Sequence, residues 1–250
     1  MIPEPFAGTP GPDNPGYKRG GLYNGGYEPD FDHFIFSPAH YALVLYAALI
    51  EAGRLDKEGL SQFNKDGSVV EMIGAEHSPG VDTTTGSLAQ SISQAAGIAL
   101  GRRLLGETGR VWVLMSDGEF QEGQVWETLQ ILAHYKLDNV GVYIDANGQQ
   151  CDGKMTDVLD LRDLRVKLEA FGARAFAVDG HDVAALAAPA EEKPDGRPLF
   201  VIAQTDPAHG IELFRERAPK LHYCRFTTEE DYQKYQADYE RLAQEAVSWR

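Results

Sequence analysis

Short apolar runs alternate with helix-like segments from residue 111 to residue 205. The runs have the length of strands: Val111–Met115, Val140–Asp145, Arg174–Val178 and Leu199–Thr205. The segments between them, 124–135, 161–171 and 181–188, have the spacing of amphipathic helices. Strands separated by helices pair in parallel, because a parallel connection has to cross back over the sheet. The chain is therefore predicted to be an α/β protein, a doubly wound parallel sheet with helices on both faces.

Three further segments flank this alternation. Residues 1–30 are rich in Pro and Gly and predict an extended arm that lies on the body or on a neighbouring subunit. We expect residues 31–250 to form one domain. Within it, His40–Ile50 is apolar nearly all round, which predicts a buried helix that ends at Gly53. Helices are also predicted over 87–105 and, as a polar amphipathic tail, over 228–249.

The composition excludes several classes of function. Lys and Arg number 23 against 38 Asp and Glu, a formal charge of −15, which argues against binding nucleic acid or an anionic membrane. The two cysteines, Cys151 and Cys224, have neither a metal-binding spacing nor a disulfide framework. No run reaches the roughly 20 apolar residues of a membrane span, and the start is not signal-like. We expect a cytoplasmic protein that acts on a small molecule.

Polar residues follow two neighbouring strands at the point where each ends. Ser116-Asp117-Gly118-Glu119 comes directly after the first run, and Asn147 closes the second, 29 positions after Gly118. Open α/β sheets bind ligands at this edge. Carboxylate and amide oxygens suit Mg²⁺ or Ca²⁺, and Gly118 lets the backbone approach a diphosphate that the cation neutralises. Each tetrapeptide alone is also typical of a turn, but together they favour a cation and diphosphate site.

A third segment, 80–90, reads Gly-Val-Asp-Thr-Thr-Thr-Gly-Ser-Leu-Ala-Gln and leads into the helix predicted over 87–105. With segment 116–153 and Val178-Asp179-Gly180-His181-Asp182, it resembles the N-terminal, diphosphate-binding half of transketolase. The resemblance extends from about Phe34 to His222 and implies the thiamine diphosphate-binding fold, with thiamine diphosphate and Mg²⁺ or Ca²⁺ as cofactors. The chain stops where the family's second half would begin, so it resembles the smaller subunit of a split transketolase. The implied partner is a complementary subunit with the pyrimidine-binding module, in a dimer of heterodimers (α2β2).

Residue by residue, the resemblance implies a metal site and a cofactor site. The metal ligands would be the side chains of Asp117 and Asn147 and the backbone carbonyl of Gln149. The residues implied to bind or border the cofactor are Thr85, Gly86, Ser87, Leu88, Ser116, Asp117, Gly118, Glu119, Glu122 and Asn147. Ser116 stands where the family has glycine, which the turn tolerates if its φ is negative. Ser87 can also cap the following helix, and Glu122 is either part of a network between active sites or an exposed first-turn carboxylate.

Three histidines are candidates for proton transfer: His40, His77 and His222. His40 falls at a family histidine that faces cofactor and substrate, whereas His77 precedes Ser78-Pro79-Gly80 in a loop near the predicted site. His222 lies near the position of a late active-site histidine in the family. His181 is expected to cap a helix away from the chemistry.

Two departures from the family bear on the substrate. Met72 replaces a histidine that contacts substrate, and an early helix with a further histidine is replaced by the Pro- and Gly-rich arm. The implied function is the transfer of a two-carbon ketol unit from a ketose-type donor to an aldehyde or ketone acceptor. The departures keep two alternatives open: decarboxylating, acyloin-forming transfer from a 2-oxo acid such as pyruvate, and a non-catalytic scaffold subunit.

Overall fold

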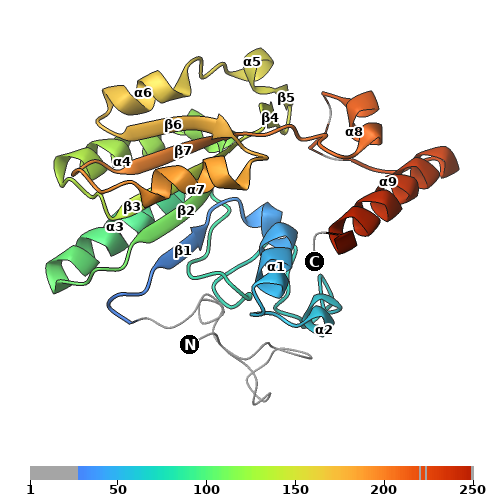
Figure 1. Cartoon of the computed structure of the whole chain (residues 1–250), viewed down its shortest axis with the longest axis horizontal. Coiled ribbons are helices and arrows are strands. Elements are labelled where there is room, and N and C mark those ends of the chain that lie inside the picture. The colour runs from blue at the N-terminus through green and yellow to red at the C-terminus, as the bar shows by residue number, and fades with distance from the viewer. Residues whose placement is uncertain (1–27, 220, 223, 249–250) are drawn as a thin grey trace.

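A five-stranded parallel sheet forms the centre of the computed structural model, which describes residues 28–219, 221–222 and 224–248 (Figure 1). Its strands are β1 (His33–Phe36), β2 (Val111–Ser116), β3 (Val140–Ala146), β6 (Arg174–Asp179) and β7 (Leu199–Gln204). They lie side by side in the order β1-β2-β3-β7-β6, and every neighbouring pair is parallel. The predicted α/β fold is confirmed. The strand β1 was not predicted, because its four residues acquire their ladder only by pairing with β2.

Helices cover both faces of the sheet. One face carries α3 (Gln90–Leu105), α4 (Gly123–His134) and α6 (Leu164–Ala170), which bury the alternate strand residues Val113, Met115, Val142 and Ile144 among others. The opposite face carries α1 (Ala42–Glu51), packed with Phe36 and Leu114, and α7 (Val183–Glu191). The hydroxyl of Tyr143 donates to the carbonyl of Leu186 in α7, 2.9 Å away. In β2, where inward residues alternate, a one-residue shift would turn Val113 and Met115 away from the α3 and α4 face.

The order of the strands determines where a ligand can bind. The chain moves outward from β1 through β2 and β3 to the edge strand β6, then returns to place β7 between β3 and β6. Right-handed crossovers put α7 on the face opposite α3, α4 and α6, because the direction of travel reverses there. All five strands end at one edge, so the loops that follow β1, β2, β3 and β7 meet there.

Some helix ends differ from the prediction. The helix predicted from residue 87 begins at Gln90, and its N-cap residue is Ala89, with φ of +68° and no side-chain cap. Ser87 therefore does not cap α3, contrary to the expectation. The helix predicted over 181–188 begins at Val183, and the carboxylate of Asp182 accepts from the N–H groups of Ala184 and Ala185. His181 is thus not the capping residue.

Several short elements were not predicted, because each depends on tertiary contacts rather than on a periodic pattern. They are the 3₁₀ turns η2 (Ala39–Tyr41) and η3 (Asp117–Gln121), the helices α2 (Lys57–Leu60), α5 (Met155–Val158) and α8 (Glu212–Arg217), and the hairpin of β4 (Gln149–Gln150) and β5 (Gly153–Lys154). Four of them, η2, η3, β4 and β5, follow the ends of β1, β2 and β3 and so contribute to the edge where the ligand site is expected.

The surface departs from the prediction at α1. The prediction that α1 is buried on all sides is wrong for one face, where the side chains of Leu43 and Val44 are 50% and 60% exposed.

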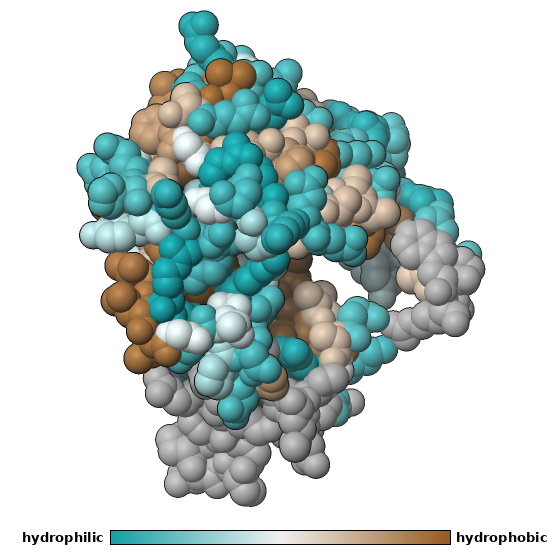
Figure 2. All heavy atoms as spheres, turned by 60° about the vertical axis from the view of Figure 1, so that its left-hand side comes forward, coloured by the Kyte–Doolittle hydropathy of each residue, from teal (hydrophilic) through white to brown (hydrophobic). Residues whose placement is uncertain are grey.

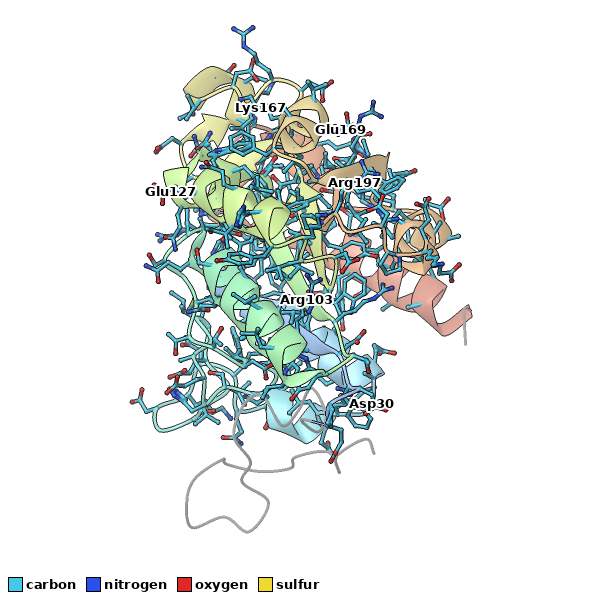
Figure 3. All side chains as sticks on the ribbon, turned by 90° about the vertical axis from the view of Figure 1, so that its left-hand side faces the viewer. Asp30, Arg103, Glu127, Lys167, Glu169 and Arg197 are labelled. Carbon is cyan, nitrogen blue, oxygen red and sulfur yellow. The ribbon has the colours of Figure 1, made fainter. Side chains whose placement is uncertain are left out.

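The outer side of the α3, α4 and α6 layer is charged and includes Glu127, Lys167 and Glu169 (Figure 3). Figure 2 shows a largely hydrophilic side of the molecule with separate apolar patches. None of the helices in the described residues has the length and apolarity that a membrane span needs.

The predicted tail helix is confirmed as α9 (Glu229–Ser248), which lies beyond the carboxyl edge of the sheet beside α8 (Figure 1). The ion pairs Arg217–Asp231 and Lys234–Glu216 join the α8 and α9 segments. Residues 1–27 of the predicted arm lie outside the described residues. The carbonyl of Pro29, just after them, accepts from the N–H groups of Thr108 and Gly109.

Candidate functional site

The predicted metal ligands meet at the carboxyl edge of the sheet. Asp117 begins η3 directly after β2, and Asn147 follows β3, the neighbouring strand. The Oδ2 atom of Asp117 accepts from the N–H of Gly148 at 2.8 Å, which ties the two loops together. The 3₁₀ turn starts here because Ser116 and Glu119 form a capping box at its first residues.

Asp117 has the character of a cation ligand. The residue is only 7% exposed, and its Oδ1 atom is buried without a hydrogen-bond partner in the described residues. The pKa of Asp117 is raised to about 6: burial is the largest cause, the N–H of Gly148 opposes it, and the nearby carboxylate of Asp145 adds to it. A buried carboxylate oxygen without a partner is costly unless a cation or donor occupies its lone pairs.

The amide of Asn147 is held in one orientation by its neighbours. Its Nδ2 donates to Oδ2 of Asp145 at 2.8 Å and to the hydroxyl of Tyr41 at 3.2 Å, while its Oδ1 accepts from the N–H of Gln149 at 2.8 Å. Asp145 is itself anchored by the hydroxyl of Thr205 in the loop after β7. A carboxylate only accepts, so Nδ2 has to face Asp145 and Oδ1 faces the other way.

These residues fit a small hard cation. Asp117 Oδ1 is unoccupied by any described residue, Asn147 Oδ1 retains a lone pair, and both are oxygen donors. No group of three or more His, Cys, Asp or Glu side chains suited to a metal occurs in the described residues. The expected set does not require one, because it combines a single carboxylate with an amide and a backbone carbonyl.

Glu119 lies beneath the site and joins three segments. The residue is fully buried; its Oε1 accepts from the hydroxyl of Ser37, after β1, and from the N–H of Ala89 at 3.1 Å, before α3. Its Oε2 accepts from the N–H of Ser116 at 2.8 Å, at the end of β2. Glu119 therefore acts on the relative position of the site loops. Ser116 has a φ of −97°, the negative value that replacing the family's glycine requires.

The loop before α3 lies against the end of β1. The hydroxyl of Thr85 donates to the carbonyl of Phe36 at 2.8 Å. Gly86 has a φ of +108°, and a Cβ there would lie 3.4 Å from that of Ala39. Leu88 is 40% exposed, as expected of an apolar wall beside a ligand, and this role stays a prediction.

Two of the three candidate histidines meet in a cavity. The rings of His40 and His222 lie 5.7 Å apart between centroids, in a cavity of about 280 Å³ that Asn147 and Gln149 also line. Burial lowers the pKa of His40, and the charge of His222 lowers it further. A neutral imidazole at the edge of the metal site is able to accept a proton from a bound substrate.

The third histidine has a separate environment. His77 Nε2 lies 2.9 Å from Oε2 of Glu71, which also accepts from the hydroxyl of Ser78 at 3.0 Å. His77 is not among the residues that line the His40 cavity. Met72, at the position of the missing family histidine, is 49% exposed.

The remaining candidates lie further from the metal ligands. Glu122 is exposed at the start of α4, which leaves both of its interpretations open. His181 Nε2 accepts from the N–H of Asp206 at 2.9 Å and joins the ends of β6 and β7. Asp117 also borders a second cavity of about 540 Å³ beside α5 and α6, so the metal position lies between two hollows of the same edge.

Sequence reasoning missed two residues that complete the site, Tyr41 and Asp145. Both adjoin predicted residues: Tyr41 follows His40, and Asp145 precedes Asn147 by two positions. Asp145 belongs to the same Asp-Ala-Asn-Gly segment as Asn147. No sequence signal distinguishes Tyr41 from the other aromatic residues of its helix.

Comparison with known proteins places the chain in a family. The family model described as transketolase, thiamine diphosphate binding domain, matches residues 25–215. A putative uncharacterized transketolase family protein of Sinorhizobium fredii is 36% identical over 80% of this chain and 72% of its own length. One of the subunits of the apulose-4-phosphate transketolase of Actinobacillus succinogenes is 34% identical over 78% of this chain and 71% of its own length.

Longer relatives match over a smaller share. Human transketolase-like protein 2 is 37% identical over 73% of this chain but only 30% of its own length. A crystal structure of the Pichia stipitis transketolase complex with sedoheptulose 7-phosphate superimposes with a TM-score of 0.66 at 27% identity, over 70% of this chain and 28% of that chain. The chain thus spans less than a third of these longer proteins. With the fold, the strand-edge site and the family match in agreement, this chain belongs to the transketolase family and carries its thiamine diphosphate-binding domain.

Proposed function

We propose that this chain is the thiamine diphosphate-binding subunit of a two-component transketolase that transfers a two-carbon ketol unit. The observation that carries the proposal is the buried Oδ1 of Asp117, which has no partner in the described residues beside an oriented Asn147. A scaffold protein has no need for such a carboxylate, because it costs stability when no cation is bound. The similarity to one of the subunits of apulose-4-phosphate transketolase, over 71% of that protein's length, supports the division into two components.

Asp117, Asn147 and the carbonyl of Gln149 would hold Mg²⁺ or Ca²⁺, which neutralises the diphosphate. When bound, thiamine diphosphate supplies the nucleophilic carbon and the electron sink for cleaving a bond next to a carbonyl. His40 accepts and returns a proton at a substrate hydroxyl, a role that its lowered pKa favours near neutral pH. His222 shares the cavity and assists, while His77, oriented by Glu71, serves a hydroxyl nearer the loop.

The second component is a complementary subunit with the pyrimidine-binding module, in a dimer of heterodimers. The exposed Leu43 and Val44 of α1 lie close in sequence to His40 and offer apolar surface beside the site. We expect the purified chain to be inactive alone and active once the complementary subunit is added. A cytoplasmic location is part of the same proposal.

The test is Asp117→Ala in the reconstituted complex. This variant should lose thiamine diphosphate affinity and ketol transfer by at least about 100-fold, since it removes a charged ligand, while its circular dichroism spectrum stays unchanged. Glu127→Ala, on the charged outer side of α4, is the control and should retain full activity. Unchanged cofactor affinity and turnover in Asp117→Ala would reject the site.

A panel of donors separates the reactions. Met72 offers no hydrogen bond to a sugar hydroxyl, and each unpaired buried hydroxyl costs roughly 1–3 kcal/mol, or about 5- to 150-fold. We expect low kcat/KM for xylulose 5-phosphate with ribose 5-phosphate, and a higher value for a modified sugar. The highest value with pyruvate and release of CO₂ would instead identify an acyloin-forming enzyme, and ordinary transketolase efficiency would show that another group replaces the missing contact.

A further inference from the structure

Tyr41 occupies the boundary between the metal site and the His40 cavity. It lies in η2, directly after His40, and its hydroxyl is 3.2 Å from Nδ2 of Asn147. Its ring meets that of His40 edge-on, with centroids 4.6 Å apart and an interplanar angle of 81°. Tyr41 and Asn147 both line the cavity of about 280 Å³.

The O–H group of Tyr41 does not donate a hydrogen bond to any described residue. The amide nitrogen of Asn147 acts only as a hydrogen-bond donor. In this contact the phenol oxygen of Tyr41 is therefore the acceptor. Asn147 is its one hydrogen-bond partner among the described residues. The proton of the hydroxyl is therefore available to a ligand in the cavity.

The surroundings indicate which ligand atom takes that proton. Three carboxylates, those of Asp145, Asp117 and Glu119, act on the Tyr41 hydroxyl through their charges. Among the described residues none of these carboxylates hydrogen-bonds the hydroxyl, and the Asp117 oxygen left without a partner, Oδ1, is the one assigned to the proposed cation. The acceptor has to come from the ligand, at the end that lies beside Asn147.

That end is the diphosphate, because Asn147 presents its amide nitrogen to Tyr41 and its oxygen to the cation position. The two amide atoms belong to one planar group, so the hydroxyl lies within a few ångströms of whatever the cation binds. The oxygens next to a cation of this kind are those of the diphosphate. A substrate hydroxyl is expected instead at the two imidazoles of the same cavity, His40 and His222, whose ring centroids lie 5.7 Å apart.

We propose that Tyr41 is a cofactor-binding residue: its hydroxyl accepts from the amide of Asn147 and donates to a diphosphate oxygen of thiamine diphosphate. The inference rests on the proposed function. It adds a neutral donor beside the carboxylates of Asp117 and Asp145 and the amide of Asn147. Because the Tyr41 ring packs edge-on against the His40 ring, Tyr41 would also connect the diphosphate to His40.

The experiment compares Tyr41→Phe with Tyr143→Phe in the complex of the full chain with its complementary subunit. Both changes remove one hydroxyl and keep the ring, and Tyr143 donates instead to the carbonyl of Leu186, on the face of the sheet that carries α7. The measurements are the thiamine diphosphate affinity at saturating Mg²⁺, the inhibition constant of inorganic diphosphate as a competitor, and kcat and KM at saturating cofactor.

Tyr41→Phe should weaken thiamine diphosphate and inorganic diphosphate by the same factor, about 10- to 100-fold for a hydrogen bond to a charged group. KM for the sugar donor should change by less than about threefold, and Tyr143→Phe should leave both affinities within that range. Unchanged cofactor affinity in Tyr41→Phe, or a raised substrate KM with unchanged diphosphate inhibition, overturns the inference but not the proposed function. A wild-type complex that binds no thiamine diphosphate overturns both.

Discussion

At the residue scale, the site combines side chains that are costly to bury without a ligand. Asp117 is the clearest case, because burial rather than a partner determines its pKa of about 6. Asn147 is oriented by Asp145 and Tyr41, so the geometry of one ligand depends on two residues that do not bind the metal. The orientation of the metal ligand Asn147 therefore depends on side chains outside the metal's own ligand set.

Asp117→Asn should stabilise the chain in the absence of metal and cofactor. The pKa of the carboxyl is raised from 3.8 to about 6 on folding, so its charged form opposes folding above pH 6, and this cost disappears below pH 3.8. A shift of this size corresponds to about 1–3 kcal/mol at pH 7.5. Urea unfolding should show the variant more stable at pH 7.5 and the difference shrinking toward pH 4.

The same comparison with ligands should reverse the order. Mg²⁺ and thiamine diphosphate bind the folded wild-type complex and raise its stability, whereas the variant lacks the charged ligand. Lower stability of Asp117→Asn at pH 7.5 without ligands would contradict the account of Asp117 as an uncompensated buried carboxylate.

At the scale of elements, one carboxylate joins β1, β2 and α3. Glu119 receives the hydroxyl of Ser37 and the N–H groups of Ala89 and Ser116, three segments that are far apart in the sequence. Ala89 adopts a φ of +68°, a conformation that costs about 1 kcal/mol for a residue with a Cβ. The bond from its N–H to Glu119 offsets that cost and brings the start of α3 to the site.

Glu119→Gln should destabilise the fold by about 1–3 kcal/mol, because the amide nitrogen of glutamine cannot accept and leaves a buried N–H unpaired. Amide hydrogen exchange should accelerate at Ala89 or at Ser116, whichever N–H faces the amide nitrogen of the glutamine. Glu122→Gln is the control, since Glu122 is exposed and its change should stay within about 0.5 kcal/mol. Equal stability of the two variants would show that Glu119 does not hold these segments together.

At the scale of the whole molecule, the site edge carries exposed apolar surface. Leu43 and Val44 in α1 and Leu88 beside the site are between 40% and 60% exposed. Leu104, 79% exposed, lies at the end of α3 that leads into β2 and so near the opposite edge of the sheet. The proposed partner would cover the first group and complete the cofactor site.

Val44→Lys should weaken association with the complementary subunit by at least about 10-fold, because burying a valine contributes roughly 1.5–3 kcal/mol and a buried lysine is opposed by desolvation. Leu104→Lys is the matched control and should leave association unchanged. Sedimentation velocity on mixtures of the two subunits measures both. A larger effect of Leu104→Lys would place the partner at the other edge of the sheet.

The sequence by itself determined the parallel sheet, the helices on its two faces and the edge where Asp117 and Asn147 meet. These features follow from local patterns: strand and helix periods, and the position of polar residues directly after strands. The negative φ required of Ser116 was likewise a local property, and the structure has it.

Only the tertiary structure decided which distant side chains meet. The pairing of His40 with His222, of Asn147 with Tyr41, and of Glu119 with Ser37 depends on how loops from different strands pack. The strand β1 and the exposed face of α1 were also decided by tertiary structure. A four-residue strand forms only beside a pairing strand, and the burial of a helix face depends on what packs against it. A local pattern records the preferences of neighbouring residues, whereas these contacts result from the packing of the entire chain.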